Sequence, residues 1–201
     1  RHNRRNRLTV IAGQADAITH GVDDPATHAA AIADAADDLR ALSGKARRFR
    51  ELVDRDETVG RPTRNAVDVV ERAVAHCRET YPEATVSLTA PDRAPVSTYG
   101  TLELALEELL ENAIVHADSE SPTVDVTVEA RPETVTISVA DDGPGLPAAE
   151  WPDDSTAESP LKHASSLGLW LVVWAVTQSG GSVECHVDDG TTVTITLHRA
   201  D

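Results

Sequence analysis

Hydrophobic residues near the start of the chain recur at alternating steps of three and four, which is the period of an amphipathic helix. The longest run consists of Ile32, Ala35, Leu39, Leu42, Ala46, Phe49 and Val53. A shorter run of the same kind precedes it and consists of Leu8, Ile11, Ala15 and Ile18. Between the runs, Gly21 provides a helix stop, and Asp24 followed by Pro25 provides a cap and a first helical residue. The pattern predicts a helical hairpin over residues 1–58.

Two helices with narrow apolar stripes bury little surface by themselves, and pairing two hairpins into a four-helix bundle is the usual solution. We therefore expect a homodimer that forms through the hairpin. The alternative is a monomeric hairpin folded onto the rest of the chain. Arg61 and Pro62 lie in a polar stretch that is typical of a linker.

Beyond the linker, helical and strand periods alternate. Three segments have a helical pattern: 67–77, 102–113 and 169–178, the last ending at Gly180-Gly181. Five segments have a strand pattern, and four of them form two hairpins: 85–90, 124–128 with 135–139, and 183–187 with 192–197. This order predicts a two-layer α/β sandwich with a largely antiparallel sheet over residues 63–201. The expected fold class is thus an α-helical hairpin followed by an α/β domain.

The charge balance excludes several partners. Lys and Arg number 18 against 34 Asp and Glu, which gives a net charge of −16. Nucleic acid and anionic membranes are therefore not expected as direct partners, because binding to both depends on positive charge. The chain is rich in acidic side chains and has lysine only at Lys45 and Lys162. This composition indicates a protein from a salt-loving organism.

The chain has neither an apolar run of roughly 20 residues nor a charged and then apolar leader, so we expect a soluble, cytoplasmic protein. It also lacks any Met, which suggests a fragment whose missing part lies upstream. Cys77 and Cys185 have no metal-ligand spacing around them and are interpreted as small core residues in a reducing compartment.

A first candidate site follows the strand that is expected to end at Ala140. The sequence Asp141-Asp142-Gly143-Pro144-Gly145 is made of common turn-forming residues, and a plain turn is one interpretation. The other is a binding loop, because glycines at a strand end let backbone approach a flat ligand. An aspartate there can accept a hydrogen bond from an exocyclic amine.

A second candidate lies on the helix before this strand pair. Glu108, Asn112 and His116 are spaced by four and share one helix face. A solvated polar face is the default interpretation, although Asn has no helix propensity to explain its place. A carboxylate and a carboxamide one turn apart could instead hold a hydrated Mg²⁺ against phosphate oxygens.

Two further features point to phosphate. Ser165, Ser166 and Gly168 open the last helix, whose free backbone N–H groups suit an anion, although every helix start has such groups. At the other end of the chain, His2 lies on the polar side of the first helix. Its neighbours include Arg1, Arg4, Arg5 and Arg7. This electropositive setting favours an incoming phosphoryl group.

In this order, the motifs resemble the transmitter core of a sensor histidine kinase, with the hairpin as its dimerisation and phosphoacceptor domain. The rest resembles the ATP-binding domain shared with gyrase, heat-shock chaperone and mismatch-repair ATPases. Glu108-x-x-x-Asn112 is similar to the asparagine box of these proteins, and Asp141-x-Gly143-x-Gly145 and Leu167-Gly168-Leu169 to their two glycine boxes. Residues 167–172 also resemble haloarchaeal members.

The resemblance implies ATP and Mg²⁺ as ligands. It assigns Asp141 to the adenine amino group, Asn112 and Glu108 to Mg²⁺, and residues 147–166 to a lid. The residues implied in nucleotide binding are Asn112, His116, Asp141, Gly143, Gly145, Leu146, Ser165, Ser166, Leu167, Gly168, Leu169 and Thr192.

The resemblance also implies that His2 takes the γ-phosphoryl group and passes it to an aspartate of a response regulator. Asn3 replaces the usual acidic neighbour of the histidine, so the role of general base falls to Glu108, while Asn6 would position water for removing phosphate from the partner. Two alternatives remain: a non-catalytic ATP-binding signalling module or partner phosphatase, and a hydrolytic ATPase with Glu108 activating water.

Overall fold

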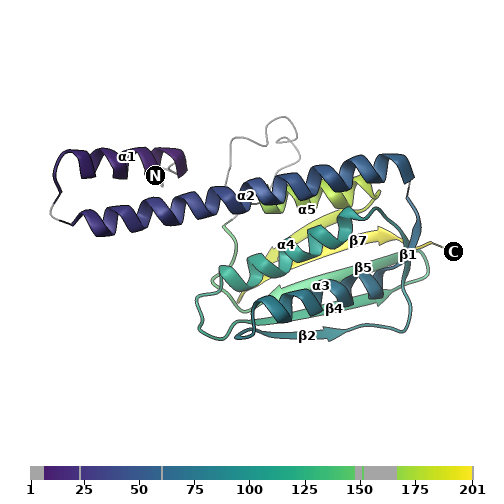
Figure 1. Ribbon diagram of the computed structural model, residues 1–201. Helices are drawn as coiled ribbons and strands as arrows, with labels where there is room; N and C mark the ends of the chain where they lie inside the picture. The colour runs from purple at the N-terminus through teal and green to yellow at the C-terminus, as the bar shows by residue number, and fades with distance from the viewer. Residues whose placement is uncertain (1–6, 23, 60, 148–150, 152–166, 201) are drawn as a thin grey trace. The chain divides into compact units, whose positions relative to one another are not determined.

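The computed structural model describes residues 7–22, 24–59, 61–147, 151 and 167–200 (Figure 1). The chain divides into two compact units, Arg1–Leu52 and Val53–Asp201. The first contains α1 (Arg7–Thr19) and most of α2 (Pro25–Val59), so the expected helical hairpin is present. Among the described helices, none combines the length and the apolar character needed to cross a bilayer.

The start of α2 is capped as its sequence predicts. Asp24 accepts a hydrogen bond from the Thr27 backbone N–H at 3.4 Å and another from the Thr27 hydroxyl. The hydroxyl contact lowers the pKa of Asp24, because it favours the charged carboxylate. Across the hairpin, His28 Nδ1 lies within hydrogen-bond distance of Gln14 Oε1.

Among the described residues of the hairpin, the apolar stripe is incompletely covered within one chain. Ala35 is buried, Ile11, Ile18 and Ile32 are half-buried, and Leu8 is 60% exposed. Burying this remaining apolar surface would stabilise the hairpin, which is the physical basis for expecting a second copy.

The second unit is a two-layer α/β sandwich (Figure 1). Its larger sheet has the strand order β2-β4-β5-β7-β6. The strands are β2 (Thr85–Thr89), β4 (Thr123–Ala130), β5 (Thr134–Asp141), β6 (Ser182–Val187) and β7 (Thr191–His198). Only the β2–β4 pair in this sheet is parallel. The sheet is therefore largely antiparallel, as its alternating sequences predict.

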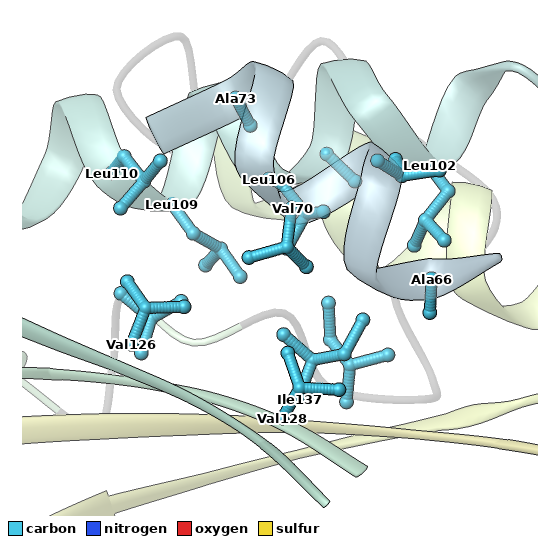
Figure 2. Close-up of a cluster of buried hydrophobic side chains, with 14 of the residues drawn as sticks. Ala66, Val70, Ala73, Leu102, Leu106, Leu109, Leu110, Val126, Val128 and Ile137 are labelled. Carbon is cyan, nitrogen blue, oxygen red and sulfur yellow. The ribbon is translucent and has the colours of Figure 1, made fainter. Parts of the chain in front are cut away.

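Three helices cover one face of the sheet: α3 (Ala66–Thr80), α4 (Thr101–Val115) and α5 (Leu167–Gln178) (Figure 1). In Figure 2, Leu106 and Leu109 of α4 point toward Val126 and Ile137 of the sheet. Asn65 caps α3 and accepts a hydrogen bond from the Val67 N–H. The apolar stepping of the helices and the alternation of the strands thus meet in one core.

The sequence did not predict a second, two-stranded sheet. Thr63–Asn65 forms β1 and pairs antiparallel with β3 (Pro95–Ser97), so the expected linker continues into a strand. Strands of three residues are too short to show a period of two. The pair is held by contacts distant in sequence, such as the Ala94 N–H donating to Asn65 Oδ1 at 2.9 Å.

Both cysteines are free thiols. Cys77 is buried in the core, and burial raises the pKa of its thiol to about 11. It is therefore protonated and unreactive at neutral pH. Burial also raises the pKa of Cys185.

Candidate functional site

A cavity of about 450 Å³ opens between the second half of α4, the end of β5, the start of β7 and the loop after β5. Its lining is mostly apolar, with a few polar side chains. The lining residues are Leu109, Asn112, Ala113, His116, Val139, Asp141, Pro144, Gly145, Leu146, Pro147, Leu169, Thr191 and Val193. This size and composition are typical of a site for a small organic ligand.

Asp141 lies in this cavity with a fixed carboxylate. Its Oδ1 accepts hydrogen bonds from the Gly143 N–H at 2.9 Å and from the Thr191 N–H at 3.2 Å. Asp141 and Thr191 are direct partners across β5 and β7, which brings the second donor into place. Because Oδ1 is occupied, Oδ2 is the oxygen left to accept from a ligand. A carboxylate offers only acceptors, so this position suits an amino group on the ligand.

The site residues expected on β5 and β7 need two corrections. Asp141 is the last residue of β5, whereas the sequence suggested that the strand ends at Ala140. On β7, Thr191 lines the cavity and Thr192 does not. Thr191 shares a strand face with Val193, Ile195 and Leu197, which are all buried. Alternation along β7 could have identified Thr191, because Thr192 points to the opposite face.

Glu108 is not part of a solvated helix face, and that default interpretation is wrong for this residue. Its side chain is only 3% exposed, because α5 packs over it. A Cβ atom at Gly168 of α5 would lie 2.6 Å from Glu108 Oε2. The Glu108 carboxylate therefore lies against Gly168 of α5, beside the cavity but outside its lining.

Asn112, one turn further along α4, does line the cavity. Its side-chain nitrogen Nδ2 is buried and has no hydrogen-bond partner among the residues that the structure describes. A buried amide N–H group without an acceptor is costly, so this atom fits a ligand that brings oxygen acceptors, such as a phosphate. His116 ends α4 as its C-cap residue and borders the same cavity.

The same residues can be tested for fit to Mg²⁺. In the described part of the chain, no group of three or more His, Cys, Asp and Glu side chains is arranged to hold a metal ion. A hard cation can still bind through one protein oxygen together with phosphate oxygens and water. The Asn112 carboxamide fits that mode, whereas Glu108 lies between the helices.

Several expected site residues can now be placed. Gly145, Leu146 and Leu169 line the cavity, and Gly143 contributes its N–H to Asp141. Leu167 begins α5. The others lie outside the described residues: His2, Asn3, Asn6, Ser165 and Ser166. The sequence did not single out the apolar walls, which include Leu109, Ala113, Val139 and Val193.

The close approach of α4 and α5 predicts a specific mutational effect. Gly168→Ala should lower the free energy of unfolding by about 1 kcal/mol, the low end of the cost of overpacking, because the atom that must move is the end of a side chain. The reason is that the new methyl group would overlap with Glu108 Oε2. Denaturant unfolding would measure the change.

The matched background is Glu108→Ala, which removes the atom that the methyl group meets. In the Glu108→Ala protein, Gly168→Ala should lower the free energy of unfolding much less, because residues in contact have coupled effects on stability. An equal cost in both backgrounds would show that the contact does not limit the packing of the two helices.

Comparison with known proteins identifies this cavity-bearing domain. Residues 98–201 match the model of the family described as histidine kinase-, DNA gyrase B-, and HSP90-like ATPase. The chain belongs to this family. Membership confirms the resemblance drawn from the asparagine and glycine boxes, and it implies ATP binding.

The similarity to sensor histidine kinases extends over both units. The chain is 32% identical over 213 residues to a probable sensor histidine kinase HK of Mycobacterium tuberculosis (strain CDC 1551 / Oshkosh). The match covers 98% of this chain and 55% of the relative, so the chain spans about half of that protein's length.

Solved structures confirm the fold. The Acinetobacter baumannii histidine kinase AdeS has a TM-score of 0.66 at 18% identity, and the match covers 98% of this chain and 97% of AdeS. The mycobacterial sensor histidine kinase MprB has a TM-score of 0.57 at 22% identity, over 69% of this chain and 98% of MprB. The α-helical hairpin followed by the ATPase-type sandwich is thus a fold that AdeS shares over nearly its whole length.

Proposed function

We propose that this chain is the catalytic core of a two-component sensor kinase that transfers the γ-phosphoryl group of ATP to His2. The observation that supports this most is a single cavity lined both by Asp141, which is fixed as an acceptor, and by Asn112, whose side-chain nitrogen has no partner among the described residues. A ligand with an amino-bearing base and a phosphate chain fits both groups, because the amino group can donate to Asp141 and the phosphate oxygens can accept from Asn112. The homologous sensor histidine kinases supply the reaction class.

In the proposed mechanism, the apolar walls Val139, Val193 and Leu109 hold the flat base, and Asp141 Oδ2 accepts from its amino group. Asn112 would hold Mg²⁺, which neutralises phosphate charge when it is bound. Backbone N–H groups at the start of α5 add electrostatic stabilisation near the phosphates.

The transfer itself forms one bond and breaks another. An imidazole nitrogen of His2 bonds to the γ-phosphorus, and the bond from that phosphorus to the bridging oxygen breaks, so ADP leaves. The proton on the other imidazole nitrogen must go to a base, and we assign that role to Glu108. A carboxylate buried between α4 and α5 is shielded from water, which strengthens its electrostatic effect.

Two partners follow from the proposal. The hairpin would pair with a second copy, because several described side chains of its apolar stripe are only half-buried or are exposed in one chain. The phosphoryl group on His2 would pass to an aspartate of a response regulator, as in two-component systems. The alternative function is a non-catalytic ATP-binding module or a partner phosphatase. It is kept because Asn3 stands where an acidic residue usually follows the histidine.

Incubation of the chain with γ-labelled ATP tests the proposal. We expect label on the protein that is lost in acid, because a phosphoramidate on histidine is acid-labile, and we expect it on the peptide that contains His2. Acid-stable label, or none with ATP still bound, would favour the non-catalytic module. Release of free phosphate without protein labelling would favour a hydrolytic ATPase.

A further inference from the structure

The tip of the last hairpin lies directly against the loop that follows β5. A Cβ atom at Gly145 in this loop would lie 2.7 Å from Val187 Cγ1 at the end of β6. Gly145 also has a φ of 83°, a left-handed conformation that side chains disfavour. The Val187 side chain therefore packs directly onto the backbone of the loop.

The same hairpin also contacts the residue that fixes the expected base position. At Gly190 a Cβ atom would lie 2.0 Å from the Asp141 carbonyl oxygen, so that turn can approach β5 only with glycine there. The next residue, Thr191, donates its N–H to Asp141 Oδ1. The Asp141 carboxylate is thus held from two sides, by the hairpin through Thr191 and by the loop through Gly143.

Val187 differs from its neighbours on the same face of β6. Val183 and Cys185 pack against the hydrophobic core, whereas Val187 is 43% exposed and is not among the residues of that core. Its packing on Gly145 is thus a contact with the loop of the cavity and contributes little to the core.

We infer that Val187 is a positioning residue for base recognition: it holds the loop of Gly143 and Gly145 so that the Gly143 N–H keeps the Asp141 carboxylate aimed at the ligand. This inference rests on the proposed nucleotide site. Val187 touches neither the carboxylate nor, in this assignment, the base. Loss of its side chain would loosen the loop, and ligand binding would have to restore the order.

Calorimetry with ADP and IDP on the full chain tests the inference. Val187→Ala should weaken ADP binding about fivefold, roughly the net contribution of one hydrogen bond. IDP presents a carbonyl where ADP presents an amino group, so it does not depend on the aim of the Asp141 carboxylate and its affinity should fall less than that of ADP. The preference for ADP over IDP should therefore fall. Val187→Ile keeps a branched side chain on Gly145 and should restore both values.

The matched control is Val183→Ala, on the same face of the same strand. It should lower the melting temperature more than Val187→Ala does and leave the preference for ADP unchanged. An unchanged preference in Val187→Ala, with ADP bound by the wild type, would overturn the positioning role. A wild type that binds neither nucleotide would overturn the proposed site as well.

Discussion

Glu108→Gln is expected to slow phosphorylation of the protein by about a hundredfold or more, the usual contribution of a general base. The amide has nearly the shape of the carboxylate, so the packing of this side chain against Gly168 of α5 is kept, but it cannot take up a proton. Glu108 lies outside the cavity lining, and the affinity for ATP should therefore stay within about threefold. Single-turnover labelling with γ-labelled ATP would give the rate.

Glu107→Gln is the control for this prediction, since Glu107 is on the same helix and is half-buried at a different angle around the axis. It should leave the rate unchanged. A full rate in Glu108→Gln would remove the base assignment. A loss of ATP affinity as large as the loss of rate would instead make Glu108 a residue that holds the nucleotide.

Asp141→Asn is expected to weaken ATP binding by about ten- to a hundredfold, which corresponds to an unpaired polar contact of roughly 1–3 kcal/mol. The structure gives a reason why asparagine cannot adapt. Two backbone N–H groups, from Gly143 and Thr191, donate to Oδ1, so the amide oxygen must stay at that position. The amide NH₂ group is then left facing the amino group of the base, and both are donors. Calorimetry with ATP would measure the change.

Asp142→Asn is the matched control, because Asp142 is exposed and its Oδ1 accepts from the Thr123 N–H instead. It should bind ATP as the wild type does. The preference of Asp141→Asn should also move toward IDP, whose carbonyl can accept from the new amide. Equal ATP affinity of Asp141→Asn and wild type would contradict the assignment of Asp141 to the base.

Much of the fold could be predicted because local periodicity reports directly which face of an element is apolar. The hairpin, the three helices of the second unit and the five strands of its larger sheet follow from steps of three and four or from alternation. The β1–β3 pair could not be predicted, since three residues carry no period. Its pairing depends on contacts such as that between Asn65 and Ala94, which are distant in the sequence.

The candidate site was predictable to a similar extent and for the same reason. Motif spacing placed Asn112 and Asp141 on elements that meet, and the structure brings both to one cavity. Spacing also grouped Glu108 with a solvated helix face, and that interpretation was wrong. Periodicity identifies the apolar and polar faces of a helix, but it does not show whether another element packs on the polar face. Only the approach of α5 through Gly168 decides that Glu108 is buried.

By itself, then, the sequence determined the element types, the two-part organisation and the motif order that marks the ATPase family, all of which depend on residue type and local spacing. The tertiary structure alone decided which polar atoms are oriented and by what. It brought the Thr191 N–H to Asp141 Oδ1, and it placed Val187 on Gly145. These contacts join residues that are far apart in the chain, so no local pattern encodes them.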